Sequence, residues 1–145
     1  MKLHFFKDEE FRGQIDMIDP RLLVLLDTLR LITGIPIAVS QHPEAIGRTT
    51  GTSWHNYKLH GAIYAIDVMP IGQWDPGDII QIATMIGFTG IGYYPDWNPR
   101  PGLHLDTRTN EEPEYPALWG GIKVDGVQVY TSIERALNRN DHMGI

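Results

Sequence analysis

The sequence predicts an α+β fold in which helices pack on a small, mostly antiparallel sheet. Segments with apolar residues at helical spacing and short strand-like segments follow one another in the order helix, strand, strand, helix and then several strands. The chain has 145 residues, of which 42% are hydrophobic and 21% charged, as in an ordinary globular protein. We therefore expect residues 1–145 to form a single domain.

The first predicted helix follows the dipeptide Asp19-Pro20. Asp19 can cap the first turn, and Pro20 suits the first helical position. Leucine and isoleucine then recur at helical spacing until Gly34, which ends the helix. The short apolar run 35–40 predicts a strand, and the polar segment 41–52 predicts a loop.

The middle of the chain contains one buried strand and one further helix. The apolar run 62–69 predicts a strand that Pro70 closes. Isoleucines at helical spacing predict a helix over 79–86, and either Asp75 or Asp78 can cap it.

The rest of the chain is rich in short strand-like segments. A hairpin with an Asp-Gly turn is the clearest of them, since this dipeptide favours tight two-residue turns. The expected elements are strands at 89–94 and 103–106 with an irregular loop 95–101 between them, the hairpin at 122–129, and a short helix around 133–137.

Composition excludes several classes of protein. The chain has no cysteine, so any metal must be held by histidine and carboxylate side chains. A formal net charge of -6 argues against nucleic acid as a partner, because phosphate backbones require a basic surface. No apolar stretch reaches the length of a membrane helix, and the N-terminus lacks the pattern of a signal peptide. We expect a protein made in the cytoplasm, without membrane insertion.

Asp67 is the most informative single residue. It lies inside the apolar strand 62–69, where an uncompensated carboxylate costs several kcal/mol to bury. A bound cation would neutralise it directly. The alternatives are that Asp67 faces solvent or pairs with Arg48.

Histidines near two strand-like segments complete a candidate zinc site. His104 alternates with apolar residues in its strand and shares a face with Asp106, which could orient its imidazole. Its alternative role is that of an ordinary buried histidine. His55 and His60 are both candidates for the second histidine, and spacing alone does not choose between them. Zinc accepts imidazole nitrogen and carboxylate oxygen as ligands, so Zn²⁺ is the expected cofactor.

Together, Ser53-x-His55, Ala65-x-Asp67 and His104-x-Asp106 resemble the zinc peptidases of the D-Ala-D-Ala carboxypeptidase family. This family includes murein endopeptidases, D-Ala-D-Ala dipeptidases and phage lysins, and shares its fold with the Hedgehog signalling domain. The resemblance implies a metallopeptidase that holds zinc through His55, Asp67 and His104. It further implies that the enzyme hydrolyses a peptidoglycan stem-peptide bond involving a D-amino acid.

Two departures from the family pattern concern individual residues. The commoner spacing places the first histidine seven residues before the aspartate, which fits His60, whereas the Ser-x-His signature favours His55. Relatives often carry the general base three residues before the last histidine, and here that position is Pro101. Asp106 and Asp96 are the alternative candidates for this catalytic role.

The resemblance also suggests a substrate-binding residue and a biological setting. Arg48 could bind a carboxylate of the substrate, since a guanidinium suits bidentate binding. A small chain without a signal peptide fits a phage or prophage lysin that acts on the cell wall after release. The alternative to an enzyme is a non-catalytic zinc-containing module on the same fold, favoured by Pro101. A metal-free interaction domain is a third possibility.

Overall fold

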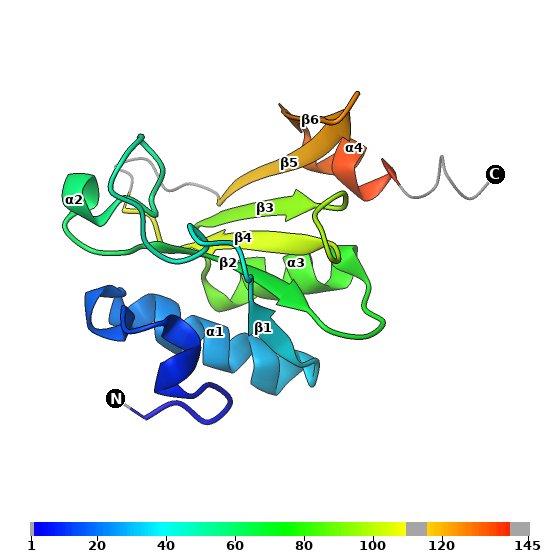
Figure 1. Ribbon diagram of the computed structural model, residues 1–145. Coiled ribbons are helices and arrows are strands. Elements are labelled where there is room, and N and C mark those ends of the chain that lie inside the picture. The colour runs from blue at the N-terminus through cyan, green and yellow to red at the C-terminus, as the bar shows by residue number, and fades with distance from the viewer. Residues whose placement is uncertain (1, 110–115, 140–145) are drawn as a thin grey trace.

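The structure, a computed structural model, describes residues 2–109 and 116–139. Within these residues the chain forms one six-stranded mixed sheet, in the order β1-β2-β4-β3-β5-β6. All neighbouring strands are antiparallel except β3 and β5, which are parallel. The strands are β1 (Ile37–Val39), β2 (Ala65–Pro70), β3 (Gly90–Tyr94), β4 (Gly102–Asp106), β5 (Ala117–Val124) and β6 (Val127–Thr131) (Figure 1). The predicted α+β class with a mostly antiparallel sheet is confirmed.

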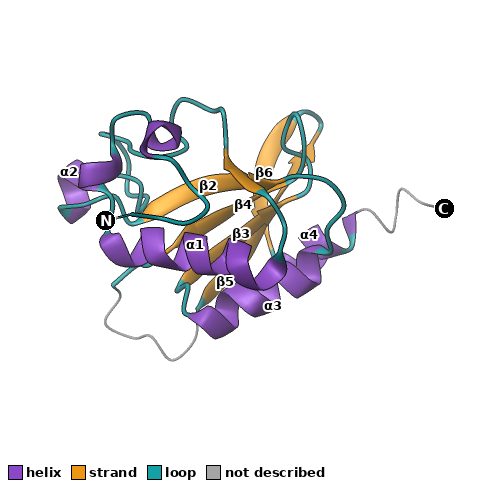
Figure 2. Cartoon of the chain, turned by 90° about the horizontal axis from the view of Figure 1, so that it is seen from below, coloured by secondary structure: helices purple, strands orange, loops and turns teal. Residues whose placement is uncertain are grey.

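The two longest helices lie side by side across one face of this sheet (Figure 2). They are α1 (Pro20–Thr33) and α3 (Pro76–Ile86). Across residues 2–109 and 116–139, no helix has the length and apolar character needed to cross a membrane. The shorter helices are η1 (Asp8–Phe11), η2 (Ile15–Met17), α2 (Tyr57–His60) and α4 (Ile133–Leu137).

Both long helices begin and end where local sequence chemistry requires. The Asp19 carboxylate accepts a hydrogen bond from the Arg21 backbone N–H, and Gly34 ends α1 with a φ of 68°. Asp75 caps α3 by accepting from the backbone N–H of Asp78. The predicted helix therefore begins three residues earlier than the isoleucine spacing indicated. The apolar spacing missed the first turn because that turn is polar.

The predicted hairpin is present, but its first strand is longer than expected. Asp125 and Gly126 have φ angles of 51° and 80°, as a tight two-residue turn between antiparallel strands requires. β5 begins at Ala117, five residues before the predicted start, because its first half pairs with the distant β3. A pairing between strands far apart in the sequence leaves little local signal.

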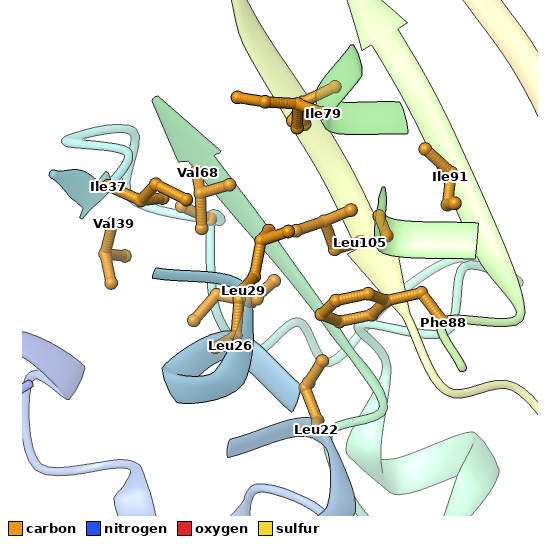
Figure 3. Packing of buried hydrophobic residues seen from close by; sticks show 14 of the residues in the cluster. Leu22, Leu26, Leu29, Ile37, Val39, Val68, Ile79, Phe88, Ile91 and Leu105 are labelled. Carbon is orange, nitrogen blue, oxygen red and sulfur yellow. The ribbon is translucent and has the colours of Figure 1, made fainter. Parts of the chain in front are cut away.

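The hydrophobic core lies between the sheet and the two long helices. Leu22, Leu26 and Leu29 of α1 point toward the strands (Figure 3). Side chains alternate between the two faces of a strand, so every second residue of β2, β3 and β4 enters this core. The core residues of these three strands are Ile66, Val68, Ile91, Tyr93, Leu103 and Leu105. The residues between them, Asp67 and His104 included, therefore lie on the opposite face.

Leu26 provides a test of this packing, with Leu31 on the same helix as its control. Leu26 is 1% exposed and Leu31 is 66% exposed. We expect Leu26→Ala to lower the free energy of unfolding by about 2–5 kcal/mol through lost burial and a residual cavity. Leu31→Ala should change it by less than about 0.5 kcal/mol. Urea denaturation measures both, and equal effects would contradict the described core.

Candidate metal centre

The candidate residues meet on the face of the sheet opposite α1 and α3, which we call the site face. The strand register places Asp67 of β2 directly opposite His104 of β4. The same row continues through Gly92 of β3 to Trp119 of β5. Alternation thus assigns the core to one face of these strands and the polar residues to the other.

His55 comes from the segment between β1 and β2. The backbone N–H of Arg48 donates to the His55 carbonyl, and the Arg48 carbonyl accepts from the N–H of Tyr57. The Asp67 N–H in turn donates to the Ala45 carbonyl, which ties this segment to β2. These bonds hold His55 in a fixed place, where it is 1% exposed.

The three predicted metal ligands form one buried cluster. Nε2 of His55 lies 3.1 Å from Oδ1 of Asp67, and Nδ1 of His104 lies 3.4 Å from the same oxygen. One ligand atom from each residue lies within 4.8 Å of the others. All three side chains are buried. The cluster could therefore hold a metal ion.

Each imidazole is oriented by a partner on its other nitrogen. Nδ1 of His55 is 2.7 Å from the carbonyl oxygen of Ile46, so this nitrogen carries the proton and donates it. Nε2 of His104 is 2.7 Å from Oδ2 of Asp106 and donates to that carboxylate. Both remaining nitrogens face Asp67. Such outer partners fix which nitrogen is free to ligate a metal.

The surroundings of His104 favour its protonated, positively charged form. Burial alone would lower the pKa of His104, but the hydrogen bond to Asp106 and the nearby carboxylate of Asp67 outweigh it and raise that pKa. Burial would likewise raise the pKa of Asp67, but the two neighbouring imidazoles of His104 and His55 outweigh it and hold that pKa well below the usual range. The centre therefore favours a positive charge beside Asp67.

Asp106 lies behind His104, on the side of the imidazole away from Asp67. Its carboxylate is 0% exposed and accepts from Nη2 of Arg108 at 2.6 Å and Nε at 2.9 Å. Burial would raise the pKa of Asp106, but the hydrogen bonds to His104 and Arg108 bring it to about 2. Gly90 makes room for it, because a Cβ there would overlap the carboxylate. Asp106 therefore positions His104 and does not face the cavity.

Asp96, the other predicted candidate for the general base, forms its contacts away from the metal cluster. Its Oδ2 accepts from the backbone N–H of Lys123 at 2.8 Å and lies 3.3 Å from Nε of Arg139. It is absent from the lining of the cavity beside the metal cluster, within the part of the chain that the structure describes. In this conformation Asp96 connects the loop 95–101 to β5.

Arg48 lies at the metal cluster. Its Nη2 is 3.7 Å from Oδ2 of Asp67, and its Nε is 3.3 Å from Oε2 of Glu44. The ion pair of Asp67 with Arg48, foreseen as the alternative to a metal, is thus present alongside the two histidines. The Arg48 side chain is 29% exposed and lines the cavity, where a ligand can reach it.

His60 is excluded from the cluster by its own contacts. Its ring stacks on Trp54 with centroids 3.9 Å apart, and its Nε2 lies 3.3 Å from the Thr52 carbonyl. The residues between His55 and Asp67 include the short helix α2, which Asn56 caps and Gly61 ends. This additional turn explains the longer spacing before Asp67.

A cavity of about 500 Å³ opens onto the cluster. Its lining is mainly aromatic and cationic, and several of these residues were not predicted from the sequence as site residues. Tyr94 and Trp119 are joined by a 2.8 Å hydrogen bond, and Arg108 lies 5.1 Å from the Trp119 ring. The glycines of β3 were the one sequence feature that indicated large side chains packed over this strand, because a Cβ at Gly92 would lie 2.6 Å from the Trp119 ring. The aromatic and arginine residues of the lining are Arg48, Trp54, Tyr94, Trp97, Arg108, Trp119 and Tyr130.

Comparison with protein-family models, with curated proteins and with solved structures finds no match for this chain. The resemblance to D-Ala-D-Ala carboxypeptidases therefore stays a prediction from the three short motifs. What the structure adds to those motifs is their convergence at one buried centre.

Proposed function

We propose that this protein is a zinc-dependent peptidase that hydrolyses peptidoglycan stem-peptide bonds involving a D-amino acid. The observation that carries the proposal is the convergence of His55, Asp67 and His104, with both histidines oriented to offer a free nitrogen beside one carboxylate. The sequence resemblance supplies the reaction, the substrate class and the Hedgehog-like fold. It also supplies the setting, a phage or prophage lysin that acts on the cell wall.

The donor set fits zinc in particular. Two imidazole nitrogens and one carboxylate oxygen are ligands that zinc accepts, and three protein ligands are typical of catalytic zinc sites. When bound in this way, zinc supplies Lewis acidity and lowers the pKa of water toward neutrality. The adjoining cavity gives a peptide access to the centre.

Two arginines have separate proposed roles. Arg48 lines the cavity and can bind a carboxylate of the substrate through its guanidinium. Arg108 holds the Asp106 carboxylate, which in turn orients His104. Asp106 thus acts as a positioning residue.

A second function, a non-catalytic zinc module, is favoured by one observation. Within the described chain, Asp67 is the only carboxylate that lines the cavity. Asp106 is enclosed by its partners and Asp96 is bound to β5, so neither candidate general base faces the cavity. A zinc module on this fold would need no proton acceptor.

Zinc stoichiometry tests the metal centre, with His55→Ala and His60→Ala as a matched pair. We expect about one zinc per chain in the wild type. His55→Ala should weaken zinc binding by more than about 100-fold, since even outer partners of ligands are worth about 10- to 100-fold. His60→Ala should bind zinc as the wild type does. Metal analysis and chelator competition measure both, and the reverse order of effects would contradict the assigned ligand.

The pH dependence of zinc-induced stabilisation tests the proton between His104 and Asp67. The raised pKa of His104 stabilises the metal-free fold below pH 6.5, the unperturbed value, and this stabilisation is lost as pH rises through the folded pKa. Zinc must displace that proton. The rise in Tm on adding zinc should therefore be larger at pH 8 than at pH 5.5. An equal rise at both values would contradict a protonated His104.

Hydrolysis of purified peptidoglycan by the zinc-loaded protein separates the two functions. We expect new peptide amino groups from the wild type and none from Asp67→Asn. Asp106→Asn should weaken zinc binding about 10- to 100-fold, with activity recovered in excess zinc. Asp96→Asn should leave zinc binding unchanged, and loss of hydrolysis in this variant would restore Asp96 as the general base. A zinc-loaded wild type that releases no peptide would favour the non-catalytic module.

A further inference from the structure

Tyr94 places a buried hydroxyl in the cavity beside the metal cluster. It is the last residue of β3, and alternation puts it on the site face, whereas the preceding Tyr93 enters the core. Tyr94 is 5% exposed and lines the cavity together with His55 and His104.

The hydrogen bond of Tyr94 with Trp119 leaves the phenolic proton available. An indole N–H can only donate, so Nε1 of Trp119 donates to the Tyr94 oxygen, over 2.8 Å. The phenol must then direct its own proton elsewhere. No acceptor for it occurs among residues 2–109 and 116–139. The donor is therefore free for a group that enters the cavity.

Packing on three sides fixes the position of this hydroxyl. The Tyr94 ring stacks on Trp97 with centroids 4.2 Å apart and planes 12° apart. A Cβ at Gly121 would overlap the ring, so this glycine lets β5 pass directly beneath it. Trp119, which donates a hydrogen bond to the Tyr94 hydroxyl oxygen, also contacts His104, with ring centroids 4.9 Å apart. The hydroxyl and the ligand imidazole thus share one rigid support.

The phenol stays protonated at neutral pH. Burial raises the pKa of Tyr94 well above its ordinary value and outweighs the opposing effect of the hydrogen bond from Trp119. At this position Tyr94 is a hydrogen-bond donor and not a base.

We propose that Tyr94 donates a hydrogen bond to the oxyanion that forms on the scissile carbonyl during peptide hydrolysis. This inference rests on the proposed peptidase function. Attack of the water oxygen on the carbonyl carbon moves the C=O π pair onto oxygen, and Tyr94 stabilises that charge while keeping its proton. When the pair returns, the C–N bond breaks, and the amine nitrogen leaves with a proton that came from the attacking water. A preorganised donor at this position is the usual means of stabilising such charge.

Binding of a tetrahedral anion tests the donor independently of catalysis. Methylphosphonate is titrated into Co²⁺-loaded protein, whose visible absorption reports a ligand at the metal. We compare the wild type with Tyr94→Phe and with Tyr93→Phe, which removes the same atom from the opposite face of β3. Tyr94→Phe should weaken methylphosphonate binding about 10- to 100-fold, as for a lost hydrogen bond to a charged group. Its affinity for Co²⁺ should be unchanged, and Tyr93→Phe should match the wild type.

The outcomes distinguish this inference from the proposed function. Equal methylphosphonate affinity in Tyr94→Phe and the wild type would overturn the donor role, even if the wild type cleaves peptidoglycan. Weaker binding in Tyr94→Phe alone would support the donor, even if no peptide substrate is found. With an active wild type, Tyr94→Phe should lower kcat about 100- to 1,000-fold with little change in KM. Failure of the wild type to bind Co²⁺ or zinc would overturn both proposals.

Discussion

The buried charge of Asp67 is the constraint on which the rest of the site depends. Asp67 is 6% exposed, and its carboxylate lies between two imidazoles whose other nitrogens are already bound to acceptors. Two lone pairs beside a carboxylate repel it unless a cation intervenes, and a proton on His104 or a metal ion can each be that cation. Arg48 supplies only part of the compensation, at 3.7 Å and with Glu44 as a competing partner. The centre is thus built for an exchangeable positive charge.

The alternation of side chains between the two faces of each strand extends this local constraint to the whole sheet. The same strands that supply the apolar core on one face carry Asp67, His104 and Asp106 on the other. Large side chains fit over this second face only where the neighbouring strand lacks a Cβ. Glycines occupy those positions, beneath the Asp106 carboxylate, the Trp119 and Trp97 rings and the Tyr94 ring: Gly90, Gly92, Gly102 and Gly121. The glycines of these strands are therefore part of the site.

The sequence correctly predicted those features of the fold and site that depend on residues close together in the chain. Asp19 and Gly34 lie at the two ends of α1, as predicted. The cost of burying the Asp67 carboxylate pointed correctly to its place in a buried cluster. Spacing could not choose between His55 and His60, because the choice depends on the turn that α2 inserts and on a carbonyl from the distant loop. The strand pattern correctly placed Asp106 on the same face as His104. Whether Asp106 met the cavity or lay behind the imidazole was decided by Arg108 and Gly90, which no local pattern reports.

The polarity of the cavity distinguishes the two functions more sharply than the metal does. Among the described residues, its lining offers several donors, from the guanidinium of Arg48 to the hydroxyl of Tyr94, and a single carboxylate, Asp67. Donors bind and stabilise negative charge, which serves both an anionic ligand and an oxyanion. Proton transfer from water needs an acceptor, and the one present is also a member of the metal cluster. Its Oδ1 faces both histidines, while Oδ2 faces Arg48. Oδ2 of Asp67 is thus already paired with Arg48, and the low pKa of this carboxylate makes it a weak proton acceptor, so a peptidase would need its proton acceptor from outside the described lining of the cavity.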